Sequence, residues 1–365
     1  MLRRLLVVRA AFFSVALLSG AACILKAQAT PAASLLVLAK RDSSLAIVDP
    51  TSLKVVARVP AGPDPHEVVA SLDGKFAFVS NYGSGAHNTL SVVDLVAQKA
   101  LAPIDLGVLH GPHGLAFAGG KVYFTAESNK VIGRYDPATS KIDWILGTGQ
   151  NRTHMIFVSN DLNRIFTSNV SSATVSIIEK SAGAFGPGGP NGPGGPPGGP
   201  PGGPNSPGAP RGPGTPDWNE TVVAVGRGSE GFDVTPDGKE LWVANAQDGT
   251  ISIIDISSKR VTHTLDANVR GANRLKFTPD GKFAFVSSLG GENLAVFDAS
   301  SRAEYKGIKL GRGAAGILMQ PEGTRAYVAC SPDNYVAVID LRTLEVIGHI
   351  DAGREPDGLA WAARQ

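Results

Sequence analysis

Cysteine is scarce in this sequence, which has two cysteines among 365 residues. Cys23 lies in an N-terminal segment that we expect to be removed, so the remaining chain has no pair from which to form an intramolecular disulfide. Cys330 lies in the apolar stretch AYVACS, and we interpret it as a small buried hydrophobic side chain. We therefore expect packing, and not covalent cross-links, to hold the fold together.

Several short motifs with defined chemistry are also missing. The sequence has no Gly-rich phosphate loop, no serine nucleophile elbow and no CxxCH haem-attachment site, so it lacks the usual signals of nucleotide, serine-hydrolase and covalent-haem proteins. The formal net charge is +2, and residues 1–29 hold four of the 34 basic residues and no acidic one. Without them the net charge is about −2, which predicts no binding to nucleic acid or to an anionic membrane.

The first 29 residues are typical of a signal peptide. An apolar run over residues 10–18 is followed by Ala27-Gln28-Ala29, the small-x-small pattern that signal peptidase accepts. The run is shorter than the roughly 20 residues of a membrane span. We predict cleavage after Ala29 and a periplasmic or secreted protein. A twin-arginine signal and a lipid anchor on Cys23 stay open as alternatives. The basic residues before the apolar run are Arg3, Arg4 and Arg9.

One sequence phrase recurs at intervals of about forty residues: a short apolar strand, a tight turn with glycine, and three further strands. Glycine supplies the positive φ that a two-residue hairpin needs. An aspartate ends most third strands, and we interpret these aspartates as turn formers, because their carboxylates can accept the following backbone amides. They are Asp94, Asp136, Asp255, Asp298 and Asp340.

Four strands per period predict an all-β, seven-bladed β-propeller built of four-stranded antiparallel blades. The expected first strands contain Glu67, Gly114, Met155, Gly231, Arg274, Gly316 and Gly358. The last of these blades lacks its remaining strands, which the segments SLLVLAK, SLAIVDP and KVVARVP near the N-terminus can supply. We therefore predict that N-terminal strands pair with the C-terminal strand and close the ring.

Residues 182–216 interrupt the pattern, since they are almost entirely glycine and proline. They cannot bury apolar surface, and we predict a disordered loop inserted between the third and fourth strands of blade three. A tolerated insertion and a site for a protein partner both stay open. The remainder of residues 30–365 is expected to form one domain.

The phrases LDGKFAFVSNYG, TPDGKELWVANAQDG and PEGTRAYVACSPDN resemble the YVTN-type repeats of YncE-like periplasmic proteins. This resemblance covers most of residues 30–365 and implies the propeller fold without naming a ligand. Residues 111–142 are similar to blades of the streptogramin (virginiamycin B) lyase group, which opens a cyclic lactone by elimination with a divalent metal and a histidine. That resemblance implies a catalytic role for His113.

The residues that precede the seven first strands occupy equivalent positions in a closed ring, so we expect them to face a common axis. Three adjacent histidines should come together there, with Glu230 beside His154 and Asp357 beside His66. In blade order these residues are His66, His113, His154, Glu230, Asn273, Ala315 and Asp357.

Imidazole with nearby carboxylate suits zinc, copper, nickel or iron, and magnesium is a further candidate. We predict His66, His113 and His154 as metal ligands, and these histidines with Glu230, Asn273, Asp357, Arg152 and Arg270 as the site for a small-molecule ligand. A water-filled polar channel, or histidines acting as acid and base without metal, are the alternatives.

Other polar residues are expected on the same face, at the ends of second strands: Asn81, Glu127, Asn169 and Asn245. Arginines on the loops between blades suit a carboxylate or phosphate ligand, or are solvated loop charges. His87 and His110 also fall on loops of this face, whereas His263 and His349 fall in outer strands. The loop arginines are Arg152, Arg227, Arg270, Arg312 and Arg354.

Three functions are compatible with the sequence. The first is an exported propeller that binds a small ligand, with or without a divalent metal, at the mouth of its channel. The second is a lactone-opening hydrolase or lyase that uses His113. The third is an interaction scaffold in which the channel has no role.

Overall fold

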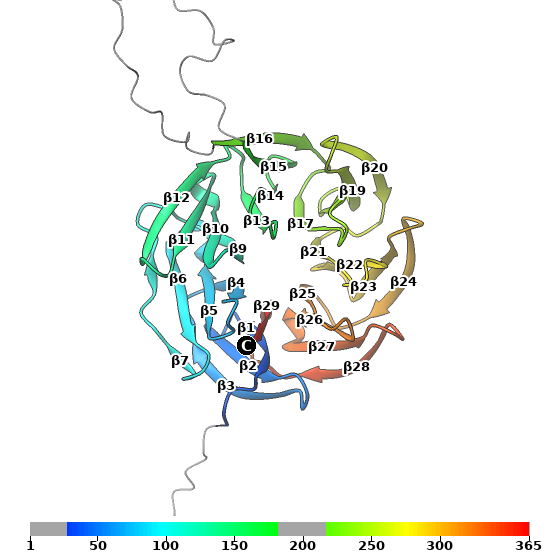
Figure 1. Ribbon diagram of the computed structural model, residues 1–365. Coiled ribbons are helices and arrows are strands. Elements are labelled where there is room, and N and C mark those ends of the chain that lie inside the picture. The colour runs from blue at the N-terminus through cyan, green and yellow to red at the C-terminus, as the bar shows by residue number, and fades with distance from the viewer. Residues whose placement is uncertain (1–27, 182–216, 365) are drawn as a thin grey trace, which may run out of the picture.

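The computed structural model describes residues 28–181 and 217–364. Their strands form seven antiparallel sheets arranged around one axis, which Figure 1 shows end-on. The predicted all-β, seven-bladed propeller is confirmed. The first strand of each sheet lies nearest the axis, and these strands are β4, β9, β13, β17, β21, β25 and β29.

The first three blades come from the N-terminal half of the chain. Blade one contains β4 (Pro65–Ala70), β5 (Phe76–Asn81), β6 (Thr89–Asp94), β7 (Lys99–Ala100) and β8 (Ile104–Asp105). Blade two contains β9 (Pro112–Ala118), β10 (Lys121–Ala126), β11 (Val131–Asp136) and β12 (Lys141–Gly147). Blade three contains β13 (Thr153–Val158), β14 (Arg164–Asn169), β15 (Thr174–Ser181) and β16 (Asp217–Ala224).

The next three blades repeat the pattern without interruption. Blade four contains β17 (Ser229–Val234), β18 (Glu240–Asn245), β19 (Thr250–Asp255) and β20 (Arg260–Asp266). Blade five contains β21 (Ala272–Phe277), β22 (Phe283–Ser288), β23 (Asn293–Asp298) and β24 (Ala303–Lys309). Blade six contains β25 (Ala314–Met319), β26 (Arg325–Cys330), β27 (Tyr335–Asp340) and β28 (Glu345–Ile350). Short 3₁₀ helices follow three second strands: η1 (Gly83–Gly85), η2 (Glu127–Asn129) and η3 (Ser331–Asp333).

The seventh blade joins the two ends of the chain, as predicted. Its inner strand is β29 (Pro356–Ala363), which pairs antiparallel with β1, so that Leu36 lies opposite Ala360. The ring therefore has no open edge at its seam. The remaining strands of this closing blade are β1 (Ala33–Ala39), β2 (Ser44–Asp49) and β3 (Lys54–Pro60).

The hairpin turns use aspartate and glycine as the sequence predicts. In blade one, Gly74 has a φ of 65°, and the Asp73 carboxylate accepts the Ser71 hydroxyl at 2.6 Å and the Lys75 amide at 3.1 Å. At the end of the third strand, the Asp94 carboxylate accepts the amides of the second and third residues beyond it. Each of the other third-strand aspartates accepts at least one of these two amides, which confirms that they form turns.

Apolar side chains fill each of the seven interfaces between neighbouring blades. Between blades four and five, for example, Trp242 packs with Leu275 and Phe277. First strands also approach one another closely at the axis, where a Cβ on Gly114 would overlap the carbonyl of His154. Glycine at this position therefore lets neighbouring first strands bring their side chains together over the channel.

Blade one departs from the predicted four strands. Its outer strand is divided into β7 and β8, which both pair with β6, and proline at position 103 between them has no amide to donate to a ladder.

Two predictions fall on residues outside the described ones. These are the glycine- and proline-rich loop at 182–216 and nearly all of the signal peptide, whose cleavage site stays a prediction. The strands that flank the insertion do pair, with Ser181 opposite Asp217. Cys330 is buried, as expected. Within the described residues, no helix is both long and apolar enough to cross a membrane.

Candidate functional site

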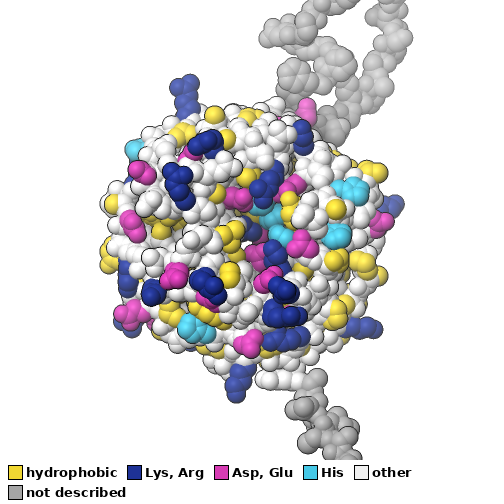
Figure 2. All heavy atoms as spheres, turned by 180° about the vertical axis from the view of Figure 1, so that it is seen from behind, with side chains coloured by type: hydrophobic (Ala, Val, Ile, Leu, Met, Phe, Trp, Pro, Cys, Tyr) yellow, Lys and Arg dark blue, Asp and Glu magenta, His cyan; other side chains and the backbone are white. Residues whose placement is uncertain are grey.

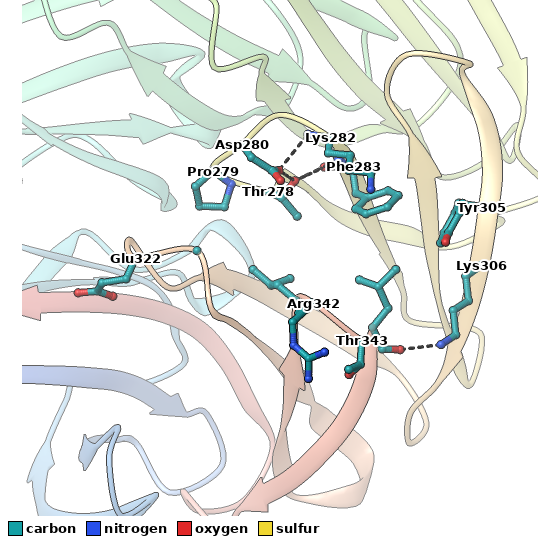
Figure 3. Close-up of a pocket in the computed structure, with 13 residues that line it drawn as sticks. Thr278, Pro279, Asp280, Lys282, Phe283, Tyr305, Lys306, Glu322, Arg342 and Thr343 are labelled. Atoms are coloured by element: carbon teal, nitrogen blue, oxygen red, sulfur yellow. Dashed lines mark hydrogen bonds between the residues drawn. The ribbon is translucent and has the colours of Figure 1, made fainter.

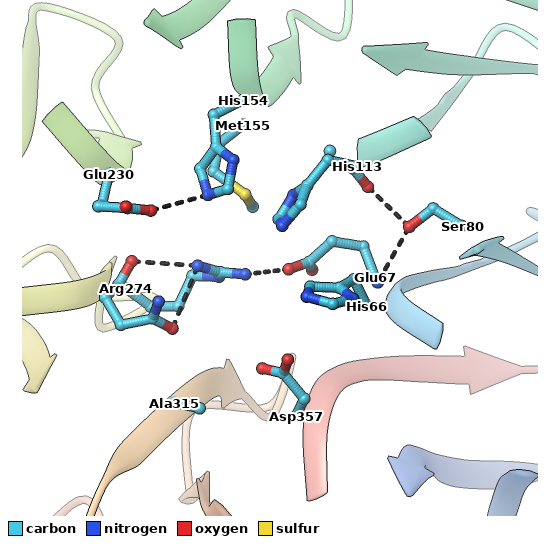
Figure 4. A network of polar contacts seen from close by, with 12 residues as sticks. His66, Glu67, Ser80, His113, His154, Met155, Glu230, Arg274, Ala315 and Asp357 are labelled. Carbon is cyan, nitrogen blue, oxygen red and sulfur yellow. Dashed lines mark hydrogen bonds and ion pairs between the residues drawn. The ribbon is translucent and has the colours of Figure 1, made fainter. Parts of the chain in front are cut away.

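Three histidines meet at one end of the channel. His66, His113 and His154 are each the second residue of a first strand, in β4, β9 and β13. The ring centroids of His66 and His113 are 5.0 Å apart, and those of His113 and His154 are 3.8 Å apart (Figure 4). Figure 2 shows the hollow at the centre of one face, with histidine, acidic and basic side chains around it.

His154 has a carboxylate on each side of its ring. Its Nδ1 contacts Glu127, and its Nε2 lies 2.8 Å from Oε2 of Glu230. Burial alone would lower the pKa of His154, but the charges of Glu230 and Glu127 outweigh burial and raise it. Burial alone would raise the pKa of Glu230, but His154 and Arg152 lower it to about 2. His154 is therefore a buried imidazolium held between two carboxylates.

Arg152 and Tyr82 complete the surroundings of these carboxylates. Arg152 spans both of them, with Nε 3.6 Å from Glu127 and Nη1 3.4 Å from Glu230. The Tyr82 hydroxyl donates to Glu127 at 2.6 Å, and burial together with that carboxylate raises the pKa of Tyr82 to about 12. Arg152, Glu127, His154 and Glu230 thus form a closed ring of alternating charge.

The surroundings of His113 favour the opposite protonation state to that of His154. It is buried, and its Nδ1 has no hydrogen-bond partner among the described residues. Burial, followed by the charges of His154 and His66, lowers the pKa of His113 far below its usual value. His113 is therefore a neutral imidazole. The atoms with which His113, Glu127 and His154 could coordinate an ion all lie within 4.8 Å of one another.

His66 uses both of its nitrogens. The Lys40 ammonium lies 3.1 Å from Nε2, and because an ammonium only donates, Nε2 must accept. The ring proton then lies on Nδ1, 3.2 Å from the carbonyl of Asp64. Burial lowers the pKa of His66. The structure therefore groups Glu127, and not His66, with the other two histidines as possible metal ligands.

An ion pair crosses the channel between opposite blades. Arg274 on β21 reaches Glu67 on β4, and its Nη1 also donates to the side-chain oxygen of Asn273 at 3.2 Å (Figure 4). The Arg274 side chain is buried. The pair links first strands that lie far apart in the sequence, and sequence reasoning missed it.

The other predicted site residues are spread around the ring. Asp357 pairs with Lys40 at 3.3 Å, and through Lys40 it is linked to His66. Ala315 is buried and offers no polar group. Arg270 donates to the backbone carbonyl of Gln247 at 3.0 Å. Asn273 thus contacts Arg274, whereas Arg270 does not contact the histidines.

The remaining loop arginines form ion pairs along the rim of the mouth. Each pairs its guanidinium and its own backbone amide with one aspartate on the loop after a second strand. These three rim clasps are Arg227–Asp248, Arg312–Asp333 and Arg354–Asp42.

The other four histidines are not part of the cluster. His110 contacts the carbonyl of Ala86 at 3.0 Å on the loop face, and His87 packs beside η1. His263 and His349 are exposed on outer strands.

Three contributors to the mouth share a position that sequence reasoning did not use for choosing ligands. Lys40, Tyr82 and Glu127 each directly follow a second strand of their blade. Of the three, Glu127 was expected on this face, but it was not chosen as a ligand. The asparagines one residue earlier, such as Asn81, instead bond to third-strand hydroxyls inside their own blades.

A separate hollow of about 690 Å³ lies away from the axis, between blades five and six (Figure 3). Its polar groups take part in local structure: Asp280 accepts the Thr278 hydroxyl at 2.6 Å, and Lys306 donates to the carbonyl of Leu344 at 2.9 Å. An equivalent groove occurs between blades four and five. The hollow is therefore a product of the repeat.

Comparison with known proteins supports the fold but no family. No protein-family profile and no curated protein matches the sequence. A functionally unknown protein from Desulfotomaculum acetoxidans has 14% identity and a TM-score of 0.68, covering 91% of this chain and 99% of its own. A provisionally assigned 6-phosphogluconolactonase from Bacteroides uniformis has 16% identity and a TM-score of 0.67, covering 90% and 99%. Hydrazine synthase of Kuenenia stuttgartiensis has 16% identity and a TM-score of 0.61, covering 81% and 89%. At such identities the likeness shows a shared fold alone, and the resemblance to YVTN-type proteins and to streptogramin lyases stays a prediction.

Proposed function

We propose that this propeller binds a divalent transition-metal ion through His113, Glu127 and His154, and through that ion a small ligand with an oxygen donor. The proposal rests on two observations: His113 is buried with no hydrogen-bond partner on Nδ1 among the described residues, and one of its ring nitrogens lies within 4.8 Å of ligand atoms of Glu127 and His154. Leaving a buried polar atom without a partner costs about 1–3 kcal/mol. Coordination of an ion would give His113 a polar partner and remove this cost.

The donor set suits zinc, cobalt, nickel or copper better than magnesium, which prefers an all-oxygen site. The ion would replace the proton that His154 and Glu127 now share. Glu230 would stay on Nε2 of His154 and hold the ring in place, as carboxylates behind metal-binding histidines commonly do. Bound in this way, the ion would supply a Lewis acid that polarises the ligand oxygen.

The proposal includes the cellular location of the protein. The leader-like residues 1–29 and the YVTN-like repeats support an exported protein in the periplasm or outside the cell. The hydrogen bonds of Thr30 with the Leu95 carbonyl and Gln98 are compatible with a mature chain that starts at this residue. The ligand would enter from the face on which the histidines lie.

Lactone opening is the second candidate function. In this candidate the ion would be held by Glu127 and His154 alone, so that the neutral imidazole of His113 stays free to accept a proton from a carbon beside a carbonyl, and the ion or Arg152 would stabilise the oxyanion that forms. The streptogramin-lyase-like residues 111–142 and the lactonase description of the Bacteroides protein favour this candidate. Ring opening that requires metal, and that His113→Ala abolishes while retaining the metal, would establish it, and saturable binding without turnover would reject it.

Elemental analysis after dialysis against zinc, cobalt or nickel tests the metal proposal. The wild-type protein should retain about one ion per chain, whereas His113→Ala and Glu127→Gln should each lose most of it. His349→Ala is the matched control, because it removes an exposed outer histidine and should retain the ion. If the His113→Ala protein takes up as much metal as the wild type, the proposal is wrong and the channel histidines have another role.

A further inference from the structure

All seven inter-blade loops place a left-handed residue two positions before the ring of first-strand residues. Glycine occupies this position in four blades, and charged residues occupy it in the other three. A non-glycine residue pays roughly 1–2 kcal/mol for this conformation, and such strain often marks functional positions. In blade order the residues are Asp64, Gly111, Arg152, Gly228, Gly271, Gly313 and Glu355, with φ between 49° and 74°.

Arg152 is the cation among these three, and it faces the candidate metal ligands. Its distances to Glu127 and Glu230, 3.6 and 3.4 Å, exceed the roughly 2.7–2.9 Å of a charge-assisted hydrogen bond. Its side chain is 39% exposed, whereas that of His154 is 2% exposed. Arg152 thus lies between the buried imidazolium and solvent, and it is held loosely.

The other cations of the mouth are more tightly engaged. The rim clasps have N···O distances of 2.6 to 2.8 Å and a second bond from the backbone amide. Arg274 is buried against Glu67, and Lys40 bonds both His66 and Asp357. Arg152 is therefore the cation beside the cluster that can exchange a partner at least cost.

We propose that Arg152 is the specificity-determining residue of the mouth and selects ligands that carry a carboxylate. This inference rests on the proposed metal function. An ion bound to Glu127 would take up that carboxylate's charge and leave Arg152 paired with Glu230 alone. The Nε side of the guanidinium would then be open to a carboxylate oxygen, and the planar fork matches a carboxylate in a way that lysine does not.

Arg152→Gly is the sharpest variant, because glycine is what four other blades carry at this position. The substitution removes the guanidinium and relieves the left-handed backbone, and thermal unfolding of the variant shows whether it stays folded. Arg152→Lys keeps the charge without the fork. Arg312→Ala is the matched control, since it removes a rim arginine paired with Asp333.

Cobalt-loaded protein titrated with acetate, and separately with acetamide, tests the inference through the visible absorption of the ion. The wild type should prefer acetate. Arg152→Gly, saturated with cobalt, should bind acetate about 10- to 100-fold more weakly, as expected for loss of a hydrogen bond to a charged group, and should no longer prefer acetate to acetamide. Arg152→Lys should be intermediate, and Arg312→Ala should match the wild type.

Each other outcome is decisive. Acetate binding by Arg152→Gly at wild-type strength, or a wild type that does not distinguish acetate from acetamide, overturns the inference and leaves the metal proposal standing. A wild type that takes up no cobalt overturns the metal proposal, and the inference falls with it.

Discussion

The rim clasps of blades four, six and seven differ from the histidine cluster of the mouth, to which blades one to four contribute. In a rim clasp such as Arg312–Asp333, the two charges satisfy each other within one blade. In the mouth, side chains from neighbouring blades converge, and Glu127, His154 and Glu230 come from three different blades. The comparison indicates that the candidate site lies where the side chains depart from the repeating pattern.

A truncation that opens the propeller ring, on which both regions depend, should have the largest effect on stability. Deleting residues 356–365 removes β29, exposes the edge of β1 and breaks the apolar packing on both sides of the closing blade. We expect the protein to lose cooperative folding, because packing on two blade interfaces is lost and a typical domain is stable by only about 5–15 kcal/mol. Circular dichroism during heating measures this. Deleting Gln365 alone is the control, and a cooperative transition in the truncated protein would contradict ring closure as the source of stability.

Replacing His154, the imidazolium of the mouth, should have the next largest effect on stability. His154→Ala leaves Glu127 and Glu230 buried without the group between them. We expect the free energy of unfolding to fall by about 3 kcal/mol, the cost of breaking a buried ion pair. Urea denaturation measures the change. Arg312→Ala, which breaks an exposed rim pair, should unfold like the wild type. Equal losses of stability in both variants would show that the mouth and the rim clasps do not differ in this respect.

The pH dependence of stability should separate the two buried histidines. The pKa of His154 is raised by Glu230 and Glu127 against the effect of burial, so its stabilising contribution is present below about pH 6.5 and is lost as pH rises through the folded-state pKa. The pKa of His113 is lowered by burial, so it has the opposite effect: stability falls as pH drops below about 6.5, because the unfolded chain takes up a proton that the folded one resists.

Urea unfolding between pH 5 and 9 checks these signs. Compared with the wild type, His154→Gln should lose the decline at high pH, and His113→Leu should lose part of the decline at low pH. Each proton contributes a slope of at most about 1.4 kcal/mol per pH unit. Identical profiles for both variants would show that the two histidines do not differ in protonation.

The smallest expected effect on stability is that of His113→Leu. The substitution removes a buried nitrogen that has no partner among the described residues and puts an apolar side chain in its place. We expect stability to be unchanged or higher by about 1 kcal/mol, while metal uptake is lost. Urea denaturation and elemental analysis of the same preparation check both parts. A marked destabilisation would mean that His113 has a structural partner.

The propeller could be predicted from its turns, because glycine after aspartate and the alternation of apolar residues act locally. The ring of His66, His113 and His154 could also be predicted, since equivalent repeat positions must share an axis. The Arg274–Glu67 pair could not, because it depends on the width of the channel between opposite blades. The different states of His113 and His154 were equally hidden, since they depend on which carboxylates each ring reaches after folding.

Anomalous diffraction from crystals soaked in zinc would locate a metal ion bound at the channel mouth. We predict one strong peak among a ring nitrogen of His113, Nδ1 of His154 and a Glu127 oxygen, with bonds of about 2.0–2.2 Å to each. Glu230 should remain on the far side of the His154 ring. A peak elsewhere, such as at His87 and His110, or no peak at the channel mouth at saturating zinc, would contradict this prediction.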